Sequence, residues 1–274
     1  MKISIITICY NSEKTIKETI ESVLGQTFPD VEYVIKDGVS NDSTLKIINQ
    51  MSKDNCIVCS QKDTGISDAF NQGIRMSTGD CIGIINSDDI LLPNASELVE
   101  KAFCEDPDVD VVYGNCICFK NELDDGYIFK PNTNLELLKS RFYLMHPAIF
   151  VKKSAYEKYG LFDCNYRNSM DFELISRFFF AGAKFKYIDE VLSAFRAGGV
   201  SDSSFKRTMI ETKKIGIRNG SSVLDMNLFV CRQYIRRAVL KILDVLNIEK
   251  QLRFLLKNQK EWASNRNDKD KKLY

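Results

Sequence analysis

The sequence predicts an α/β protein built on a doubly wound, mostly parallel sheet with helices on both faces and a helical extension at the C-terminus. Over the first 115 residues, short runs rich in β-branched residues alternate with segments of helical period, the order that βαβ units produce. Polar residues also follow each predicted strand at its carboxyl end, where open α/β sheets bind their ligands. From residue 205 onward the pattern is helical.

The predicted elements of the first 115 residues are short and regularly spaced. Strands are expected at 3 to 8, 32 to 36, 56 to 60, 81 to 85 and 109 to 113, and helices at 13 to 25, 43 to 51, 66 to 77 and 94 to 104. The first helix shows the pattern well, because Ser12 is a favourable N-cap residue and Ile16 and Ile20 begin one apolar stripe.

After Gly114 the elements become shorter and less regular. We expect a hairpin around 124 to 126, a strand at 148 to 152, a helix at 171 to 181, and strands at 185 to 188 and 191 to 195. The prediction is therefore one domain, 1 to 204, made of a ligand-binding half, 1 to 115, and a second half, 116 to 204, on the same sheet.

Residues 205 to 274 form the predicted basic helical extension. They hold 17 Lys and Arg against 7 Asp and Glu, a net charge of +10, which leaves −9 for residues 1 to 204. Ile235, Val239 and Ile242 form an apolar stripe beside basic residues. This pattern fits either peripheral contact with a membrane or packing on protein, including a homodimer. The last ten residues are predicted to be disordered.

Composition limits the cellular setting. The chain has 274 residues, 44% of them hydrophobic, and no run that approaches the roughly 18 consecutive apolar residues of a membrane span. The N-terminus shows no signal-peptide pattern, so we expect a cytoplasmic protein, in contact with the inner membrane face if the extension binds lipid. The nine cysteines are an odd number, which favours reduced thiols over a disulfide framework.

Four polar segments follow the first four predicted strands, at 7 to 11, 37 to 44, 62 to 65 and 86 to 89. Because parallel strands end at the same edge of a sheet, these loops should line one crevice. Asp88 and Asp89 predict a site for Mg²⁺ or Mn²⁺, which prefer oxygen ligands, although an Asx turn would also explain them. Asp37 is placed to bond a base or ribose.

Several nucleotide-binding classes lack their motifs. The first strand is not followed by Gly-x-Gly-x-x-Gly, and no Gly-Lys-Ser/Thr loop occurs, so a dinucleotide oxidoreductase and a P-loop kinase lose their main support. A nucleotidyltransferase would need a Gly- and Arg-rich phosphate loop near residue 10, where this chain reads Cys-Tyr-Asn-Ser.

Five segments together resemble family 2 glycosyltransferases of the GT-A fold. They read ISIITICYN (3 to 11), SVLGQTFPDVEYVIKDGVSNDST (22 to 44), DTGISDAFNQGIRMSTGD (63 to 80), IGIINSDDILLP (82 to 93) and MDFELISRFFFAGAKF (170 to 185). They occur in the family's order, which is far more specific than any single motif. The resemblance implies an inverting transfer from a nucleoside diphosphate sugar to a hydroxyl, assisted by Mn²⁺ or Mg²⁺.

The resemblance also assigns the donor site. The metal ligand falls on Asp88, with Asp89 beside it, in a motif where Asn86 stands at a place often held by Asp. Gly38 likewise replaces the second Asp of a common pair, and the expected nucleotide is UDP. The nucleotide-sugar positions fall on Ile8, Tyr10, Asn11, Asp37, Asp63, Asn71, Arg75 and Ser87.

On the acceptor side, the family's Glu-Asp motif reads Met170-Asp171, and Asp171 is the expected catalytic base. A positioned base typically contributes 10²- to 10⁴-fold to the rate, and the same residue could also cap its helix. His146, the only histidine, is either a structural residue or a contact to donor, acceptor or metal. Arg196 precedes a Gly198-Gly199 turn that could close over the site.

The resemblance implies addition of a single sugar, because the Gln-x-x-Arg-Trp motif of processive synthases is absent. The expected acceptor is a glycan or lipid-linked glycan in bacterial polysaccharide assembly, such as O-antigen or capsule, and no nucleic-acid partner is expected. Two other functions stay open: a non-catalytic nucleotide-sugar-binding relative and a nucleotidyltransferase of related fold.

Overall fold

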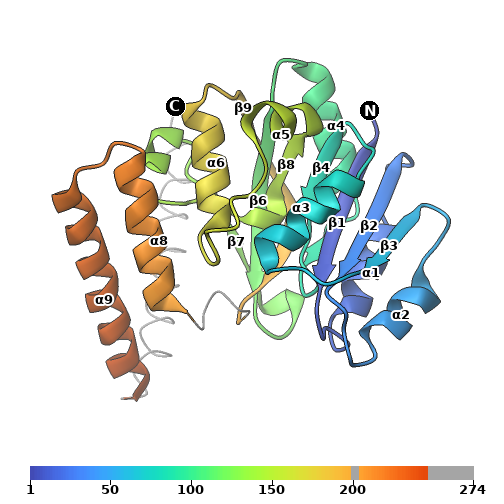
Figure 1. Ribbon diagram of the computed structural model, residues 1–274, viewed down its shortest axis with the longest axis horizontal. Helices are drawn as coiled ribbons and strands as arrows, with labels where there is room; N and C mark the ends of the chain where they lie inside the picture. Colours follow the sequence, from blue (N-terminus) through green and yellow to red (C-terminus); the bar gives the residue numbers. More distant parts are fainter. Residues whose placement is uncertain (199–203, 246–274) are drawn as a thin grey trace, which may run out of the picture. The chain divides into compact units, whose positions relative to one another are not determined.

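The structure is a computed structural model that describes residues 1–198 and 204–245 (Figure 1). The chain forms two compact units, Met1–Ser221 and Ser222–Tyr274. The first unit contains the sheet and the helix α8 (Phe205–Arg218), which the sequence analysis assigns to the C-terminal extension. The described part of the second unit is the helix α9 (Val223–Val245). The predicted disorder of the last ten residues lies outside the described residues.

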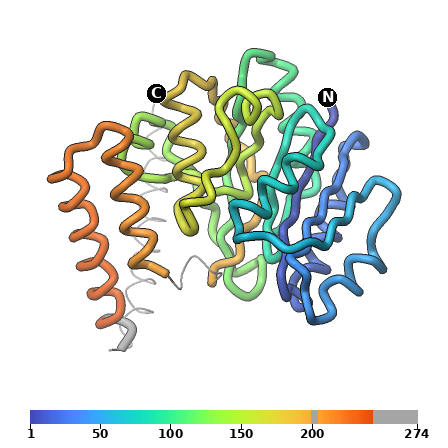
Figure 2. The backbone as a smooth tube through the Cα atoms, viewed as in Figure 1, coloured from blue at the N-terminus to red at the C-terminus, as the bar shows by residue number. Residues whose placement is uncertain are grey.

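Among the described residues, nine strands form one sheet in the order β3-β2-β1-β4-β8-β6-β9-β5, with β7 paired to β6. Their bounds are β1 Ile3–Cys9, β2 Val31–Asp37, β3 Cys56–Ser60, β4 Cys81–Ile84, β5 Ile90–Leu91, β6 Val111–Phe119, β7 Tyr127–Phe129, β8 Ile149–Lys152 and β9 Phe185–Arg196. The first four strands are parallel, and β8 runs antiparallel between β4 and β6. The N-terminal strand therefore lies inside the sheet (Figure 2).

Helices cover both faces of this sheet (Figure 1). In the first unit they are α1 Ile16–Leu24, α2 Thr44–Met51, α3 Ile66–Met76, α4 Ala95–Glu105, α5 Lys153–Tyr159, α6 Met170–Phe180 and α8. One apolar core packs α1 and α4 on the sheet through buried Ile20 and Val99, and a second packs α3 and α6 through Phe70 and Phe178. Burying each such side chain contributes about 1.5–3 kcal/mol. The predicted α/β fold with helices on both faces is confirmed, but the sheet is mixed rather than mostly parallel, because four of its eight strand pairings among the described residues are antiparallel.

The longest strands differ from the prediction. The segments 185 to 188 and 191 to 195 belong to one strand, β9, whose register against β6 shifts between Tyr113 and Asn115. The extra residues form a bulge, which bends a strand without ending it. Gly114 does not end β6, which continues to Phe119. A glycine is needed at this position, since an added Cβ would come within 2.8 Å of the Glu190 carbonyl oxygen on β9. In the hydrophobic pattern of the sequence, the bulge in β9 and Gly114 in β6 look like the ends of strands.

The structure also bears on the predicted hairpin and on the predicted reduced cysteines. The hairpin around 124 to 126 is confirmed, because β6 and β7 pair antiparallel around a 3-10 helix at Leu123–Asp125. All nine cysteines fall within the described ranges, and there none forms a disulfide.

The helix α9 of the second unit is unusually apolar on its surface. Its exposed large hydrophobic residues are Val223, Leu224, Leu228, Tyr234, Ile235, Val239, Leu240 and Ile242. Within residues 1–198 and 204–245, no helix has the length and apolar run that a membrane crossing requires.

Candidate functional site

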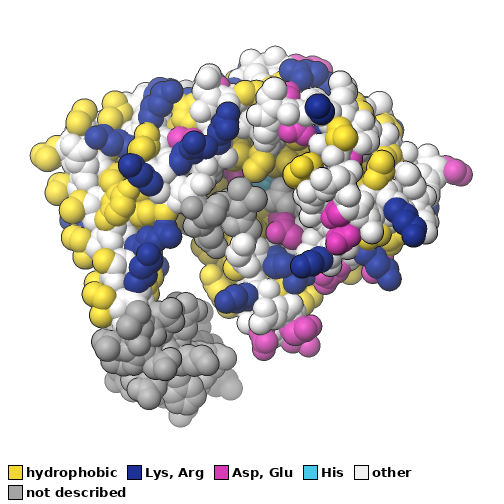
Figure 3. All heavy atoms as spheres, turned by 60° about the horizontal axis from the view of Figure 1, so that its bottom comes forward, with side chains coloured by type: hydrophobic (Ala, Val, Ile, Leu, Met, Phe, Trp, Pro, Cys, Tyr) yellow, Lys and Arg dark blue, Asp and Glu magenta, His cyan; other side chains and the backbone are white. Residues whose placement is uncertain are grey.

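The predicted crevice lies where β1, β2, β3 and β4 end side by side, and Figure 3 shows acidic side chains around a hollow on this face. Polar side chains connect its loops. Asn11 accepts a hydrogen bond from the Asn41 N–H (3.0 Å), and its own N–H donates to Ser40 Oγ (2.9 Å). The hydroxyls of Ser12 and Ser87 lie 2.9 Å apart. Asn11 and Ser87 therefore hold the crevice loops together.

Asp37 anchors the loop after β2. Its buried carboxylate accepts hydrogen bonds from the N–H groups of Val39 (3.0 Å) and Ser40 (3.1 Å) and from the hydroxyls of Ser40 and Ser60 (2.5 Å each). Burial raises the pKa of Asp37, but the bonds from Ser40 and Ser60 outweigh it and leave that pKa below its ordinary value. The predicted contact with a base would require one of these bonds to open.

Tyr10, Gly38 and Asp63 lie close together beside this loop. The Tyr10 side chain is 61% exposed, and a Cβ added to Gly38 would lie 3.4 Å from its ring and 3.2 Å from Asp63 Oδ2. A side chain at residue 38 would crowd Asp63, so glycine allows the ring and the carboxylate to lie close to this loop. Asp63 is held by the fully buried Lys36, whose Nζ lies 3.3 Å from Oδ2. The exposed ring, the bare glycine and the held carboxylate are suited to a nucleobase and ribose.

The adjacent carboxylates after β4 have different environments. Asp89 has no exposed surface, and its oxygens accept bonds from the Arg196 N–H (3.0 Å) and Asn86 Nδ2 (3.1 Å). Burial, followed by repulsion from Asp88, raises the pKa of Asp89 to about 8. Asp88 is half-buried, its pKa is raised by burial, and no other described residue donates to its carboxylate. Asp89 therefore braces the turn, and its predicted role as a metal ligand stays a prediction.

The residues that could hold an ion are few. Among the described residues, no group of three or more His, Cys, Asp or Glu is placed to hold a metal. Among residues 1–198 and 204–245, Asp88 presents a carboxylate to which no other residue donates, at the end of the central strands. A hard cation takes six or more oxygen ligands, so this site fits an ion only if a second molecule, such as a diphosphate, supplies most of them.

Arg196 braces the same turn. Its Nε donates to the Asp88 carbonyl (3.1 Å), its Nη2 lies 2.5 Å from Glu18 Oε2, and its guanidinium stacks 4.5 Å above the Phe119 ring. These contacts join β9 to α1 and β6. The prediction of a substrate contact stays a prediction, whereas a structural role is directly visible.

Asp171 lies in the first turn of α6, on the second-core face of the sheet. Its side chain is 25% exposed, Oδ1 is buried without a hydrogen-bond partner among the described residues, and His146 Nε2 lies 3.7 Å away. Burial raises the pKa of Asp171, and His146 opposes that rise. A desolvated carboxylate of this kind is a stronger proton acceptor than one in water.

Aromatic rings and a small cavity fix this pair. The His146 ring packs 5.2 Å from the Phe70 ring and 6.5 Å from the Phe162 ring. A cavity of about 10 Å³ lies beneath His146 and Asp171 and is otherwise lined by Tyr156 and apolar residues. This packing leaves the imidazole little freedom to turn away from the carboxylate.

Three predicted donor positions make other contacts in the structure. The buried Asn71 amide exchanges two 2.9 Å hydrogen bonds with the backbone of Phe162 and so ties α3 to the segment before α6. Arg75 is in the last turn of α3, about 14 Å from the helix start that faces the crevice. The Ile8 side chain packs against the second core, so only its backbone can reach the crevice, and the predicted backbone contact stays a prediction. For Asn71 and Arg75, helical spacing alone does not show which residues of α3 face the crevice.

Sequence reasoning missed Glu211 on α8. This buried carboxylate accepts hydrogen bonds from three consecutive N–H groups, those of Arg167 (3.1 Å), Asn168 (2.9 Å) and Ser169 (2.8 Å). It thereby holds the turn that leads into α6 and Asp171. The only sequence signal is an acidic residue in a basic helix, which is too common to be diagnostic.

The sequence model described as "Glycosyl transferase family 2" matches residues 4–160, more than half of the chain. The chain belongs to this family. Among curated relatives of this glycosyltransferase, the Escherichia coli chondroitin synthase is 29% identical over 85% of the chain, which spans only 36% of that protein. A "PGL/p-HBAD biosynthesis glycosyltransferase" of Mycobacterium bovis is 28% identical over 78% of the chain and 86% of its own length.

Solved structures show the same fold. S. aureus TarS 1–349 in complex with UDP-GlcNAc matches the glycosyltransferase with a TM-score of 0.63 at 19% identity, over 84% of this chain and 70% of TarS 1–349. The mannosyltransferase PcManGT from Pyrobaculum calidifontis, in complex with GDP-Man and Mn²⁺, matches with a TM-score of 0.62 at 16% identity, over 84% of this chain and 69% of that one. These likenesses confirm the predicted GT-A fold.

Proposed function

We propose that this glycosyltransferase transfers a single sugar from a UDP-sugar to a hydroxyl of a glycan or lipid-linked glycan in bacterial polysaccharide synthesis. The observation that carries the proposal is the Asp171 carboxylate, desolvated and paired with His146 at the start of α6. The strand-end loops provide the nucleotide slot, and α6 provides the base.

The donor half of the reaction uses the loops of β1, β2 and β4. Tyr10 would stack on the base above Gly38, and the turn fixed by Asp37 presents backbone groups to the ribose. Asp88 would hold Mn²⁺ or Mg²⁺ together with the donor diphosphate, because no other residue in the described part of the chain donates a hydrogen bond to this strand-end carboxylate. When bound, the ion supplies neutralisation of the negative charge that develops on the diphosphate leaving group.

The acceptor half uses Asp171. A neutral hydroxyl is a weak nucleophile, so the carboxylate accepts its proton as the oxygen attacks the anomeric carbon and the bond to the diphosphate breaks. Attack from the face opposite the leaving group inverts the anomeric centre. Burial raises the pKa of Asp171 and so strengthens the base, while His146 opposes that rise.

The comparisons support the substrate classes of this proposal. TarS has been solved with UDP-GlcNAc, PcManGT with GDP-Man and Mn²⁺, and the E. coli relative is a chondroitin synthase. A single transfer is supported by the sequence, which lacks the Gln-x-x-Arg-Trp motif of processive synthases.

A panel of nucleotide sugars tests the proposal. Calorimetric titration of the full chain, with and without Mn²⁺, should show one UDP-sugar that binds more tightly with the ion. Slow metal-dependent hydrolysis of that donor should follow, because water can replace the acceptor. Donor binding without any hydrolysis or transfer would favour the non-catalytic relative, and absence of nucleotide binding would contradict both.

The surface of helix α9 suggests that the protein binds its acceptor at a membrane. Its exposed Ile235, Val239 and Ile242 alternate with Arg and Lys, which favours the surface of an anionic membrane. Anionic vesicles should therefore sediment the full chain, and the binding should weaken as salt rises. Salt-independent self-association in place of vesicle binding would indicate a homodimer instead.

A further inference from the structure

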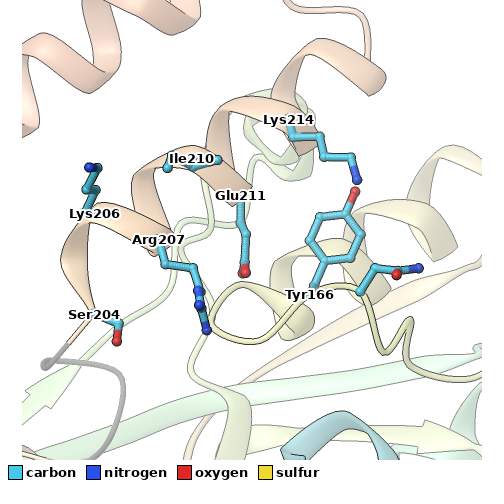
Figure 4. Close-up of a pocket in the computed structure, with 8 residues that line it drawn as sticks. Tyr166, Ser204, Lys206, Arg207, Ile210, Glu211 and Lys214 are labelled. Atoms are coloured by element: carbon cyan, nitrogen blue, oxygen red, sulfur yellow. The ribbon is translucent and has the colours of Figure 1, made fainter.

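A second pocket lies outside the donor crevice, in the first compact unit. It has a volume of about 610 Å³ and is bounded by the first half of α8 and by the segment before α6. Figure 4 shows Arg207, Glu211 and Lys214 along one side of α8, with Tyr166 opposite. The polar residues of its lining are Tyr166, Ser204, Lys206, Arg207, Glu211 and Lys214.

The charges of this pocket are not balanced by protein. Lys206, Arg207 and Lys214 are exposed, and within the described ranges none forms an ion pair with a carboxylate. Glu211 cannot serve them, since three backbone N–H groups already bond its oxygens. The lining therefore has a net charge of +2, from three cations and Glu211, and the Glu211 carboxylate is already bonded to backbone N–H groups.

Two further features favour an anion. Lys206 and Arg207 occupy the first turn of α8, which contains no acidic residue, although the positive end of a helix dipole disfavours cations and attracts anions. Tyr166 faces Lys214 across the pocket (Figure 4), and Lys214 Nζ lies 5.0 Å from the centroid of the Tyr166 ring. A cation over an aromatic ring keeps its positive charge, so Lys214 can still attract an anion.

The pocket is joined to the reaction site through its wall. The Tyr166 carbonyl accepts a 2.9 Å hydrogen bond from Ser67 in the first turn of α3, at the crevice. Asp171 follows Tyr166 by five residues, a separation of at most about 17 Å even for an extended chain. An anion in this pocket therefore lies within reach of a sugar chain whose hydroxyl approaches Asp171, on the acceptor side.

We propose that this pocket binds a phosphoryl group carried by the acceptor. That the bound group belongs to the acceptor rests on the proposed function. The anion site itself is inferred only from the residues that line the pocket. A phosphate monoester carries about −1.5 to −2 charges at neutral pH, which matches the lining, whereas a uronate carries only one. Arg207 offers the paired donors that phosphate oxygens prefer, and Lys214 adds single donors.

The test uses the full chain saturated with UDP in EDTA, so that neither the donor loops nor a metal recruits the probe. Calorimetry then measures the affinity of inorganic pyrophosphate, farnesyl diphosphate and glucuronate. Arg207→Gln and Lys214→Gln should each weaken diphosphate binding about 10-fold, because each removes a charge-assisted hydrogen bond. Lys213→Gln is the matched control, since Lys213 is the neighbouring cation on α8 but does not line the pocket.

The outcomes separate the alternatives. Equal affinity for the two diphosphates supports a site for the phosphoryl group alone, and tighter farnesyl diphosphate supports a lipid-linked source. Equal weakening by Lys213→Gln and Arg207→Gln, no saturable diphosphate binding, or preference for glucuronate would each overturn the proposal. UDP affinity should be unchanged in Arg207→Gln. If wild-type protein fails to bind UDP, the proposed function fails while the diphosphate titration, run without UDP, still tests the pocket.

Discussion

Replacement of His146 by Gln should move the acid limb of the pH–rate profile to higher pH. Asp171 acts as a base only when ionised, so activity falls as pH drops through its folded pKa. Burial raises that pKa and His146 lowers it. Gln keeps a polar group near the carboxylate but cannot become positive, so the opposing influence is lost and the pKa of Asp171 rises further.

The size of the shift follows from the separation of the charges. Two unit charges 3.7 Å apart attract by about 1 kcal/mol in water and about 4 kcal/mol at an effective dielectric constant of 20. Both side chains are partly exposed, at 14% and 25%, so the lower half of this range applies. With about 1.4 kcal/mol per pKa unit, we expect a displacement of about one to two pH units wherever the imidazole is charged.

The assay is kcat/KM for the best donor between pH 4.5 and 9, for the wild type and His146→Gln. His146→Phe serves as a second variant, because it preserves the aromatic packing against Phe70 while removing the charge. Both variants should show the same displacement. An acid limb that stays in place while the donor KM rises would refute the pairing and assign His146 to the donor site.

Three further predictions concern individual carboxylates. Asp88→Ala should abolish metal-dependent tightening of UDP-sugar binding in calorimetry while the protein stays folded; unchanged dependence on Mn²⁺ would remove Asp88 as the ligand. The pKa of Asp89, raised to about 8, means that its favourable contribution is complete below about pH 4 and lost as pH rises through 8. Urea unfolding of Asp89→Asn should accordingly show a smaller loss of stability between pH 5 and 8 than the wild type, and an equal pH dependence would contradict this environment. Glu211→Gln should lower kcat and destabilise the fold by about 1–3 kcal/mol at unchanged UDP affinity, whereas Glu157→Gln, at an exposed site on α5, should do neither.

The sheet was predictable because each parallel strand is a short apolar run that ends in turn-forming polar residues. The crevice loops follow from the same pattern, since parallel strands must end at one edge. The bulge in β9 was not predictable, because a change of register against β6 leaves no local signal in hydrophobicity.

The division of labour within the site was only partly predictable. Asp88 and Asp89 are identical in sequence terms, and only the turn braced by Arg196 decides which one is buried. Asn71 and Arg75 share a helix with crevice residues, but Asn71 bonds the backbone of Phe162 and Arg75 lies in the last turn of the helix, which spacing alone did not show. Glu211 acts from more than 40 residues away along the chain, a contact that no motif encodes.

The most direct test of the account is Asp171→Asn, measured by donor binding and by transfer on the same preparation. Asn keeps the size and burial of the side chain but cannot accept the proton of the acceptor hydroxyl. We expect unchanged UDP-sugar affinity and a transfer rate lower by about 100-fold or more. A loss of donor affinity that accounts for the whole effect, or full transfer activity, would contradict the assignment of Asp171 as the base.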